Sequence, residues 1–65
     1  MKKVIPTDVY DRDGNLVRID FHNEAGDFEL QALWDENDPQ DSEHRIKFRE
    51  WAYRMLGQKD LEVMV

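Results

Sequence analysis

The sequence predicts an α+β fold, in which a three-stranded antiparallel meander packs against one α-helix in the order β-β-β-α. Two observations predict it. Apolar and polar side chains alternate between residues 4 and 34 around two glycine-containing turns, and apolar side chains recur at helical spacing between 39 and 56. Renewed alternation over 61–65 allows a short C-terminal fourth strand. The 65 residues are expected to form a single small α+β domain (1–65), whose core is small because a domain of this size buries only about 60% of its unfolded surface.

Two similar segments mark the corners of the meander. "DRDG" (11–14) and "NEAG" (23–26) each begin with Asp or Asn and end with glycine, which is typical of a type I turn. The first side chain accepts a local backbone N–H, and the glycine adopts the left-handed conformation that follows. We therefore interpret this near-repeat, whose period is twelve residues, as two hairpin corners rather than as a functional repeat.

The residues around the first corner alternate as half-buried strands do. One face of the second predicted strand carries Val17, Ile19 and Phe21, and the other carries Leu16, Arg18, Asp20 and His22. In the third strand, one face carries Phe28, Leu30, Ala32 and Trp34. A three-residue first loop pairs Asp11 with Asn15. The cross-strand pairs expected from it are Val9 with Val17, Asp8 with Arg18, and Ile5 with Phe21.

The second loop needs one more residue, because a one-residue shift of register moves every side chain to the opposite face. We therefore predict a four-residue loop, Glu24 to Asp27. The expected pairs are then Phe21 with Leu30 and Ile19 with Ala32. Pro6 removes a backbone donor from the first strand, so that strand is expected at an edge of the sheet.

The polar segment "DENDPQDSEH" (35–44) contains the predicted helix start. Asp38 suits the cap and Pro39 the first helical position, and Asp41 and Glu43 place negative charge near the positive end of the helix dipole. Gly57 is expected to end the helix. The stripe expected to cover the sheet consists of His44, Phe48, Trp51, Ala52 and Met55, with Leu56 beside it.

Charge is unevenly distributed along the chain. Fifteen acidic residues against nine Lys and Arg give a net charge of −6, which argues against simple polyanion binding. Residues 7–43 hold twelve acidic and two basic residues, whereas 44–59 hold five basic residues and one acidic residue. Carboxylates expected to meet a cationic partner surface are Asp35, Glu36, Asp38 and Asp41, with Glu24 and Asp27 on the neighbouring loop. The alternative is that these charges serve solubility and helix capping.

The helix offers a second candidate surface. Ile46 and Tyr53 lie seven residues apart on the side away from the predicted core stripe, and Arg49 is close to Tyr53. Such an exposed apolar pair on a basic helix is typical of a docking patch or a dimer seam. The alternative is that both residues belong to the flank of a broad helix that packs under the last segment of the chain.

Few residues suit catalysis or metal binding. The chain has no cysteine, and neither His22 nor His44 has a partner at metal-ligand spacing, although His44 can pair with Asp41 at the helix start. The "DRDGN" segment resembles a calcium loop in its acidic residues, but Val9 falls on the first ligand position. We expect no enzyme activity, no cofactor and no metal, because so small a core hardly walls off a catalytic pocket.

These observations favour a small acidic protein-binding module that occupies a basic, nucleic-acid-binding surface of a partner protein, as a phage or mobile-element inhibitor or accessory protein would. Two alternatives remain. One is a nucleic-acid-binding domain of β-β-β-α type that uses the basic helix, and the other is a structural homodimer formed through the helix or an edge strand. The N-terminal "MKKVIPTDVY" lacks the apolar run of a signal peptide or membrane span, so a cytoplasmic location without membrane contact is expected.

Overall fold

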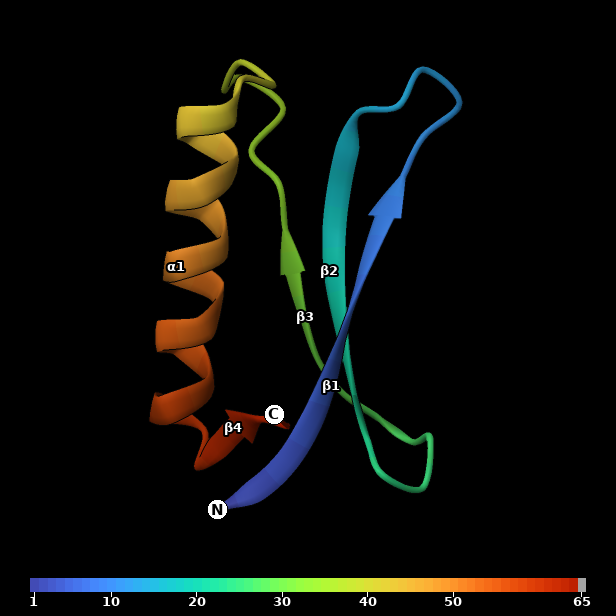
Figure 1. The fold of residues 1–65 in the computed structure, drawn as a ribbon, viewed down its shortest axis with the longest axis vertical. Helices are drawn as coiled ribbons and strands as arrows, with labels where there is room; N and C mark the ends of the chain where they lie inside the picture. The colour runs from blue at the N-terminus through green and yellow to red at the C-terminus, as the bar shows by residue number, and fades with distance from the viewer. Residues whose placement is uncertain (65) are drawn as a thin grey trace.

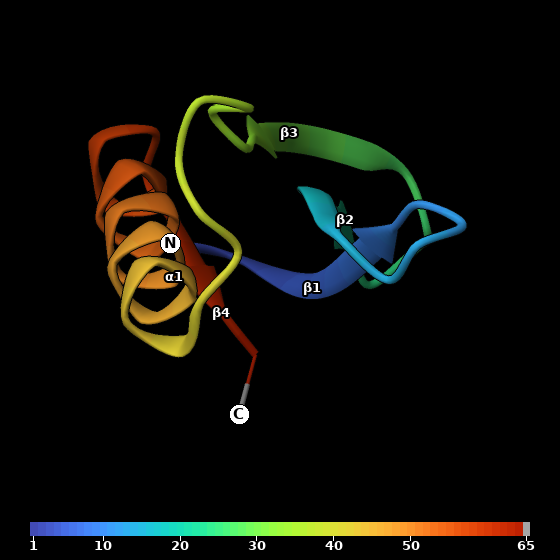
Figure 2. The ribbon, with the colours of Figure 1, turned by 90° about the horizontal axis from the view of Figure 1, so that it is seen from above.

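The computed structural model describes residues 1–64 and contains four strands and one helix. In chain order they are β1 (Lys2–Tyr10), β2 (Leu16–Asn23), β3 (Phe28–Leu33), α1 (Ser42–Gln58) and β4 (Leu61–Val63). The strands form one sheet of order β3-β2-β1-β4, in which β1 and β4 are parallel and the other pairs are antiparallel. Helix α1 packs beside the sheet, and the strands curve around it when viewed from above (Figures 1 and 2). The predicted α+β fold with a short fourth strand is confirmed, and Val65 of the predicted last segment lies outside the described residues.

The two predicted corners share one hydrogen-bonding pattern. The side chain that opens each turn, Asp11 or Asn23, accepts the backbone N–H groups two and four residues ahead at 2.9–3.0 Å. Its backbone carbonyl accepts the glycine N–H at 3.1 Å in the first turn and 3.0 Å in the second. Gly14 and Gly26 have φ angles of 81° and 88°, which favour glycine. The near-repeat is therefore two copies of one turn, as predicted.

A β-bulge follows the first turn and changes the predicted register. The expected bond between Asp11 N–H and the Asn15 carbonyl is present at 2.9 Å. Tyr10 then pairs with Leu16 and Val9 with Arg18, so Val17 is an extra residue in β2. The predicted partners of Val9, Asp8 and Ile5 are therefore wrong by one residue, because their observed partners are Arg18, Ile19 and His22.

This bulge also reassigns two side chains between the faces of the sheet. Leu16, predicted on the outer face, is fully buried. Asp8 lies opposite the buried Ile19 and so shares the face that α1 covers. The alternation of hydrophobic residues alone could not reveal this, because the extra residue interrupts the two-residue period.

The second hairpin has the predicted four-residue loop, Glu24 to Asp27, between its strands. The predicted pairs Phe21–Leu30 and Ile19–Ala32 are confirmed. The register is reached through a second bulge, because Phe28 pairs with His22 and Glu29 is the extra residue. Phe28 was predicted on the core face, but it is 57% exposed and its ring meets the His22 ring edge-on at 5.9 Å.

The first strand is not an edge strand along its whole length, contrary to the expectation from Pro6. β4 pairs with β1 at Lys2 to Val4, on the side away from β2. Pro6 lies beyond this short pairing, where its missing N–H costs no bond to β4. The proline therefore marks where the parallel pairing has ended rather than an edge along the whole strand.

The helix begins and ends later than predicted. Asp41, not Asp38, is the cap, and its Oδ1 accepts the His44 N–H at 2.8 Å. The expected contact between the Asp41 carboxylate and the His44 ring is present at 2.7 Å. Gly57 lies inside the helix, and Asp60, with a φ of 58°, is the left-handed residue that follows it. Asp, like Asn, tolerates this conformation, so the chain reverses without a glycine.

The core joins all four strands to one stripe of α1. Its buried cluster consists of Val4, Ile19, Phe21, Ala32, Ala52, Leu56 and Leu61, and the partly buried apolar residues packed against it are Leu30, Phe48, Met55 and Val63. Phe48, Ala52, Met55 and Leu56 thus confirm most of the predicted stripe. Trp51 is 44% exposed, because the stripe is rotated toward the half-buried Arg45 and Arg49.

Candidate protein-binding surface

Six acidic residues from two chain segments gather at one end of the molecule. The β1–β2 turn and the segment between β3 and α1 both lie at the end where α1 begins, at the top of Figure 1. We call this group the acidic end, and it comprises Asp11, Asp13, Asp35, Glu36, Asp38 and Asp41. Asp11 and Asp13 are absent from the predicted partner-binding residues, because the sequence pattern assigns them to the first hairpin turn. Antiparallel pairing was the available signal, since it brings the start of β2 beside the end of β3.

The other two predicted carboxylates lie elsewhere. Glu24 and Asp27 are in the β2–β3 loop, which Figure 1 shows at the opposite end of a molecule 32 Å long. The expectation that they neighbour the segment after Trp34 is therefore wrong. The physical reason is that β3 separates them, because the loop before a strand and the segment after it lie at opposite ends of that strand.

Gln40 fixes the acidic segment to the sheet. Its side-chain Oε1 accepts the Leu16 N–H at 2.9 Å, and its Nε2 donates to the Leu16 carbonyl at 2.9 Å. β3 ends at Leu33, before it could pair with Leu16. The Gln40 amide therefore bonds the Leu16 backbone groups that a longer β3 would have paired. Arg45 donates to Gln40 Oε1 at 3.0 Å and to the Gly14 carbonyl at 3.3 Å. These bonds tie the first turn, the acidic segment and the helix start together.

The carboxylates of the acidic end are not neutralised by nearby Lys or Arg. Within residues 1–64, the carboxylates of Asp13, Glu36 and Asp38 take part in no ion pair or hydrogen bond, and Asp35 accepts only the Asn37 N–H at 3.0 Å. Backbone N–H donors hold two others in the charged form. The pKa of Asp11 is lowered chiefly by the Asn15 N–H, and that of Asp41 chiefly by the His44 N–H.

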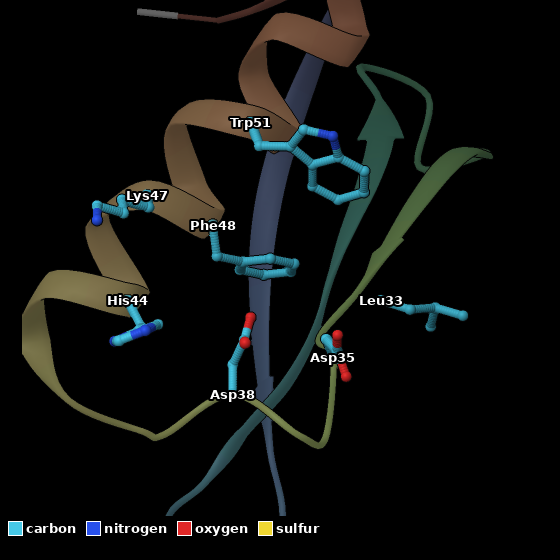
Figure 3. Close-up of a pocket in the computed structure, with 7 residues that line it drawn as sticks. All are labelled: Leu33, Asp35, Asp38, His44, Lys47, Phe48 and Trp51. Atoms are coloured by element: carbon cyan, nitrogen blue, oxygen red, sulfur yellow. The ribbon is translucent and has the colours of Figure 1, made fainter.

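A hollow of about 300 Å³ lies between the acidic segment and α1. Figure 3 shows the residues that line it, which are Leu33, Asp35, Asp38, His44, Lys47, Phe48 and Trp51. The Phe48 ring lies 5.0 Å from the Trp34 ring and 5.9 Å from the Trp51 ring, so the helix side of the hollow is aromatic. Another hollow is lined partly by Asp11 and Glu36.

The predicted patch on the helix is only partly available. The Arg49 guanidinium donates to both Asp8 carboxylate oxygens at 2.9 Å, and this contact lowers the pKa of Asp8. Tyr53 is 37% exposed, but its ring meets the buried Phe21 ring edge-on at 6.1 Å. Ile46 is 58% exposed. Arg49 and Tyr53 thus contribute to packing, and Ile46 is the member of the patch that faces solvent most fully.

Comparison with protein-family models, with curated proteins and with solved structures finds no match to this chain. Within residues 1–64, no helix is long and apolar enough to cross a membrane. The same residues contain no group of three or more His, Asp or Glu side chains arranged to hold a metal ion.

Proposed function

We propose that the protein is a small protein-binding module whose acidic end occupies a basic, nucleic-acid-binding surface of a partner protein. The observation that carries this proposal is that six carboxylates from two chain segments lie at one end of the molecule, several of them without a cationic partner. Such a surface attracts the Lys and Arg side chains that bind phosphate and speeds association at low salt. The role of a phage or mobile-element inhibitor or accessory protein fits this mode of binding.

Nucleic-acid binding through α1 is the alternative, and the contacts of the helix argue against it. Three of its basic side chains already have partners: Arg45 bonds Gln40 and Gly14, Lys47 pairs with Glu43, and Arg49 pairs with Asp8. Releasing Arg45 and Arg49 for phosphate would break contacts that join the helix to other segments, whereas the exposed Lys47–Glu43 pair lies within the helix and contributes little. In addition, the nearby acidic end repels phosphate.

A homodimer is the third candidate, and the edge position of β3 favours it. No strand of residues 1–64 pairs with the outer side of β3. An unpaired edge is a template for strand addition by a second copy. Sedimentation equilibrium tests this candidate directly, and a monomer at high micromolar concentration would exclude it. Dimerisation through β3 would leave the acidic end available for a partner.

The test of the proposal compares two variants that remove the same number of charges. Asp13→Asn, Glu36→Gln and Asp38→Asn are combined in the acidic-end variant, and Glu24→Gln, Asp27→Asn and Glu50→Gln in the control. Each protein is used to capture partners from a nuclease-treated bacterial lysate, and the captured partner is then purified. We expect a basic protein that binds the wild type and the control at least about tenfold more tightly than the acidic-end variant at low salt.

Competition completes this test. Duplex DNA or single-stranded RNA should displace the protein from the purified partner if both use the same basic surface. Equal affinity of the two variants for the partner, or a complex that nucleic acid does not disturb, would overturn the proposal. Binding of the wild type to nucleic acid itself would favour the alternative that uses α1.

A further inference from the structure

We propose that the hollow between the acidic segment and α1 receives an arginine side chain of the partner. The guanidinium packs against Trp51 and Phe48 and pairs with Asp35 and Asp38, which line the same hollow. This inference rests on the proposed function and goes further, because it names the residue that is recognised and the residues that recognise it.

The aromatic side of the hollow suits a flat cation. Trp51 remains 44% exposed on the flank of α1, beside the Phe48 ring at an interplanar angle of 31°. The Trp34 ring meets the Phe48 ring edge-on, with 5.0 Å between the ring centroids, and this contact helps to hold Phe48 in place. A guanidinium over a tryptophan face gains cation–π attraction, and its planar shape allows stacking.

The hollow carries unpaired negative charge, because Asp35 and Asp38 form no ion pair within residues 1–64. Figure 3 shows the Asp38 carboxylate pointing toward the Phe48 ring and Asp35 at the neighbouring wall. The two basic side chains at the rim, Lys47 and His44, have partners of their own. Lys47 projects away from the hollow and lies 3.1 Å from Glu43, and the His44 ring lies 2.7 Å from the Asp41 carboxylate. A cation from outside therefore meets two carboxylates that no Lys or Arg of residues 1–64 neutralises.

The shape and chemistry favour arginine over lysine. A volume of about 300 Å³ is at the small end for binding pockets and suits one long side chain. Arginine offers several donors in one plane and pairs with carboxylates in a fork geometry, whereas lysine is a compact point charge that stacks poorly. Arginine is also a common phosphate contact of nucleic-acid-binding surfaces, which are the surfaces that the acidic end is proposed to occupy.

The test is a titration followed by two-dimensional 15N NMR, with N-acetyl-L-arginine N-methylamide as the probe. The matching citrulline amide is the control, because it keeps the planar shape and lacks the charge. At constant ionic strength, we expect the Trp51 indole N–H signal to shift to saturation, with a Kd on the order of a few millimolar, as a single side chain allows. The citrulline amide should bind at least about tenfold more weakly, and the lysine amide about threefold more weakly.

Two pairs of substitutions locate the binding. Asp35→Asn with Asp38→Asn should weaken arginine binding about tenfold, whereas Asp13→Asn with Glu36→Gln, which removes equal charge outside the hollow, should change it less than about twofold. Trp51→Leu should weaken it about threefold or more while the remaining spectrum reports a folded chain.

Equal weakening by both pairs, equal binding of citrulline, or no shift of the Trp51 signal by about 20 mM arginine amide would overturn the inference. The proposed function would survive any of these results, since the partner would then recognise the acidic end through diffuse charge. Conversely, arginine-amide binding in the hollow without loss of the partner in the acidic-end variant would overturn the proposed function, and it would leave a guanidinium site that this partner does not use.

Discussion

The contact between Asp8 and Arg49 shows how one residue can anchor α1 to the sheet. The bulge at Val17 places Asp8 on the helix face, where both its oxygens accept hydrogen bonds from the Arg49 guanidinium at 2.9 Å. The two residues are 41 positions apart in the sequence, so the contact joins β1 to α1 over a long loop of chain. Arg49 hydrogen bonds lower the pKa of Asp8, and Asp8 in turn raises that of Arg49.

This pair should stabilise the protein in a pH-dependent way. Because the pKa of Asp8 is lowered on folding, its contribution is complete above the unfolded-state pKa of about 3.9 and is lost as the pH falls through the lower folded-state pKa. A double-mutant cycle with Asp8→Asn and Arg49→Gln should give a coupling free energy of about 1 kcal/mol at pH 7, since both side chains are partly exposed to solvent. Urea denaturation at pH 7 and near pH 2 measures it, and an unchanged coupling in acid would contradict the expectation.

Gln40 makes a different single-residue contribution. Substitution by alanine leaves the backbone N–H and carbonyl of the fully buried Leu16 without their side-chain partner. We expect Gln40→Ala to lower the free energy of unfolding by about 1–3 kcal/mol. The exposed Gln58 supplies the control, because Gln58→Ala makes the same chemical change near the end of α1 and should alter stability by less than about 0.5 kcal/mol. Similar losses in both variants would show that the amide does not fix the acidic segment.

At the scale of elements, both hairpins repeat one unit that consists of an Asx-opened turn, a left-handed glycine and a bulge three residues after that glycine. Val17 follows Gly14 and Glu29 follows Gly26 at this spacing. In each hairpin the bulge shifts the strand register by one residue just after the turn.

The three glycines test this interpretation. Gly14→Ala and Gly26→Ala force alanine into a positive φ and should each destabilise the protein by about 1 kcal/mol. Gly57 is helical, and no other atoms lie near its missing Cβ, so Gly57→Ala should stabilise by about 0.5–1 kcal/mol. Thermal denaturation of the three variants measures these opposite signs. Stabilisation by all three substitutions would show that the turns do not require glycine.

Sequence patterns predicted those features that depend on local chemistry. The turns, the strand order of the meander and the pairs of Phe21 and Ile19 with β3 follow from turn residues and alternation. The bulges could not be predicted, because each one depends on which backbone pairs the folded sheet can satisfy. They account for the errors at Leu16, Asp8 and Phe28. The predicted helix end at Gly57 was wrong because the chain reverses at Asp60, which adopts the left-handed conformation without a glycine.

The candidate site was harder to predict than the fold. Its four carboxylates between β3 and α1 were evident from charge, but Asp11 and Asp13 join them only through the pairing of distant strands. Gln40 gave no sequence signal, because its two bonds reach a backbone 24 residues away. The hollow depends on Trp51 lying outside the core stripe. This position follows from a rotation of the helix by a fraction of a turn, which the sequence pattern does not define.

At the scale of the whole molecule, α1 returns the chain from the acidic end to the first strand. β4 completes this return beside the N-terminal residues of β1, at the end of the molecule opposite the acidic end (Figure 1), and its Leu61 joins the buried cluster. Because the buried cluster includes residues of every strand and of α1, a loss of packing at β4 should also destabilise the distant acidic end.

Leu61→Ala should therefore lower the free energy of unfolding by about 2–3 kcal/mol, a large share of the roughly 3–5 kcal/mol that a domain of this size can supply. The urea transitions followed by far-UV circular dichroism and by fluorescence of the two tryptophans should shift together, because one cooperative unit contains both ends. Met64→Ala, at an exposed neighbour, should shift neither transition appreciably. A variant whose fluorescence transition stays at the wild-type position would show that the acidic end is stable by itself, without β4.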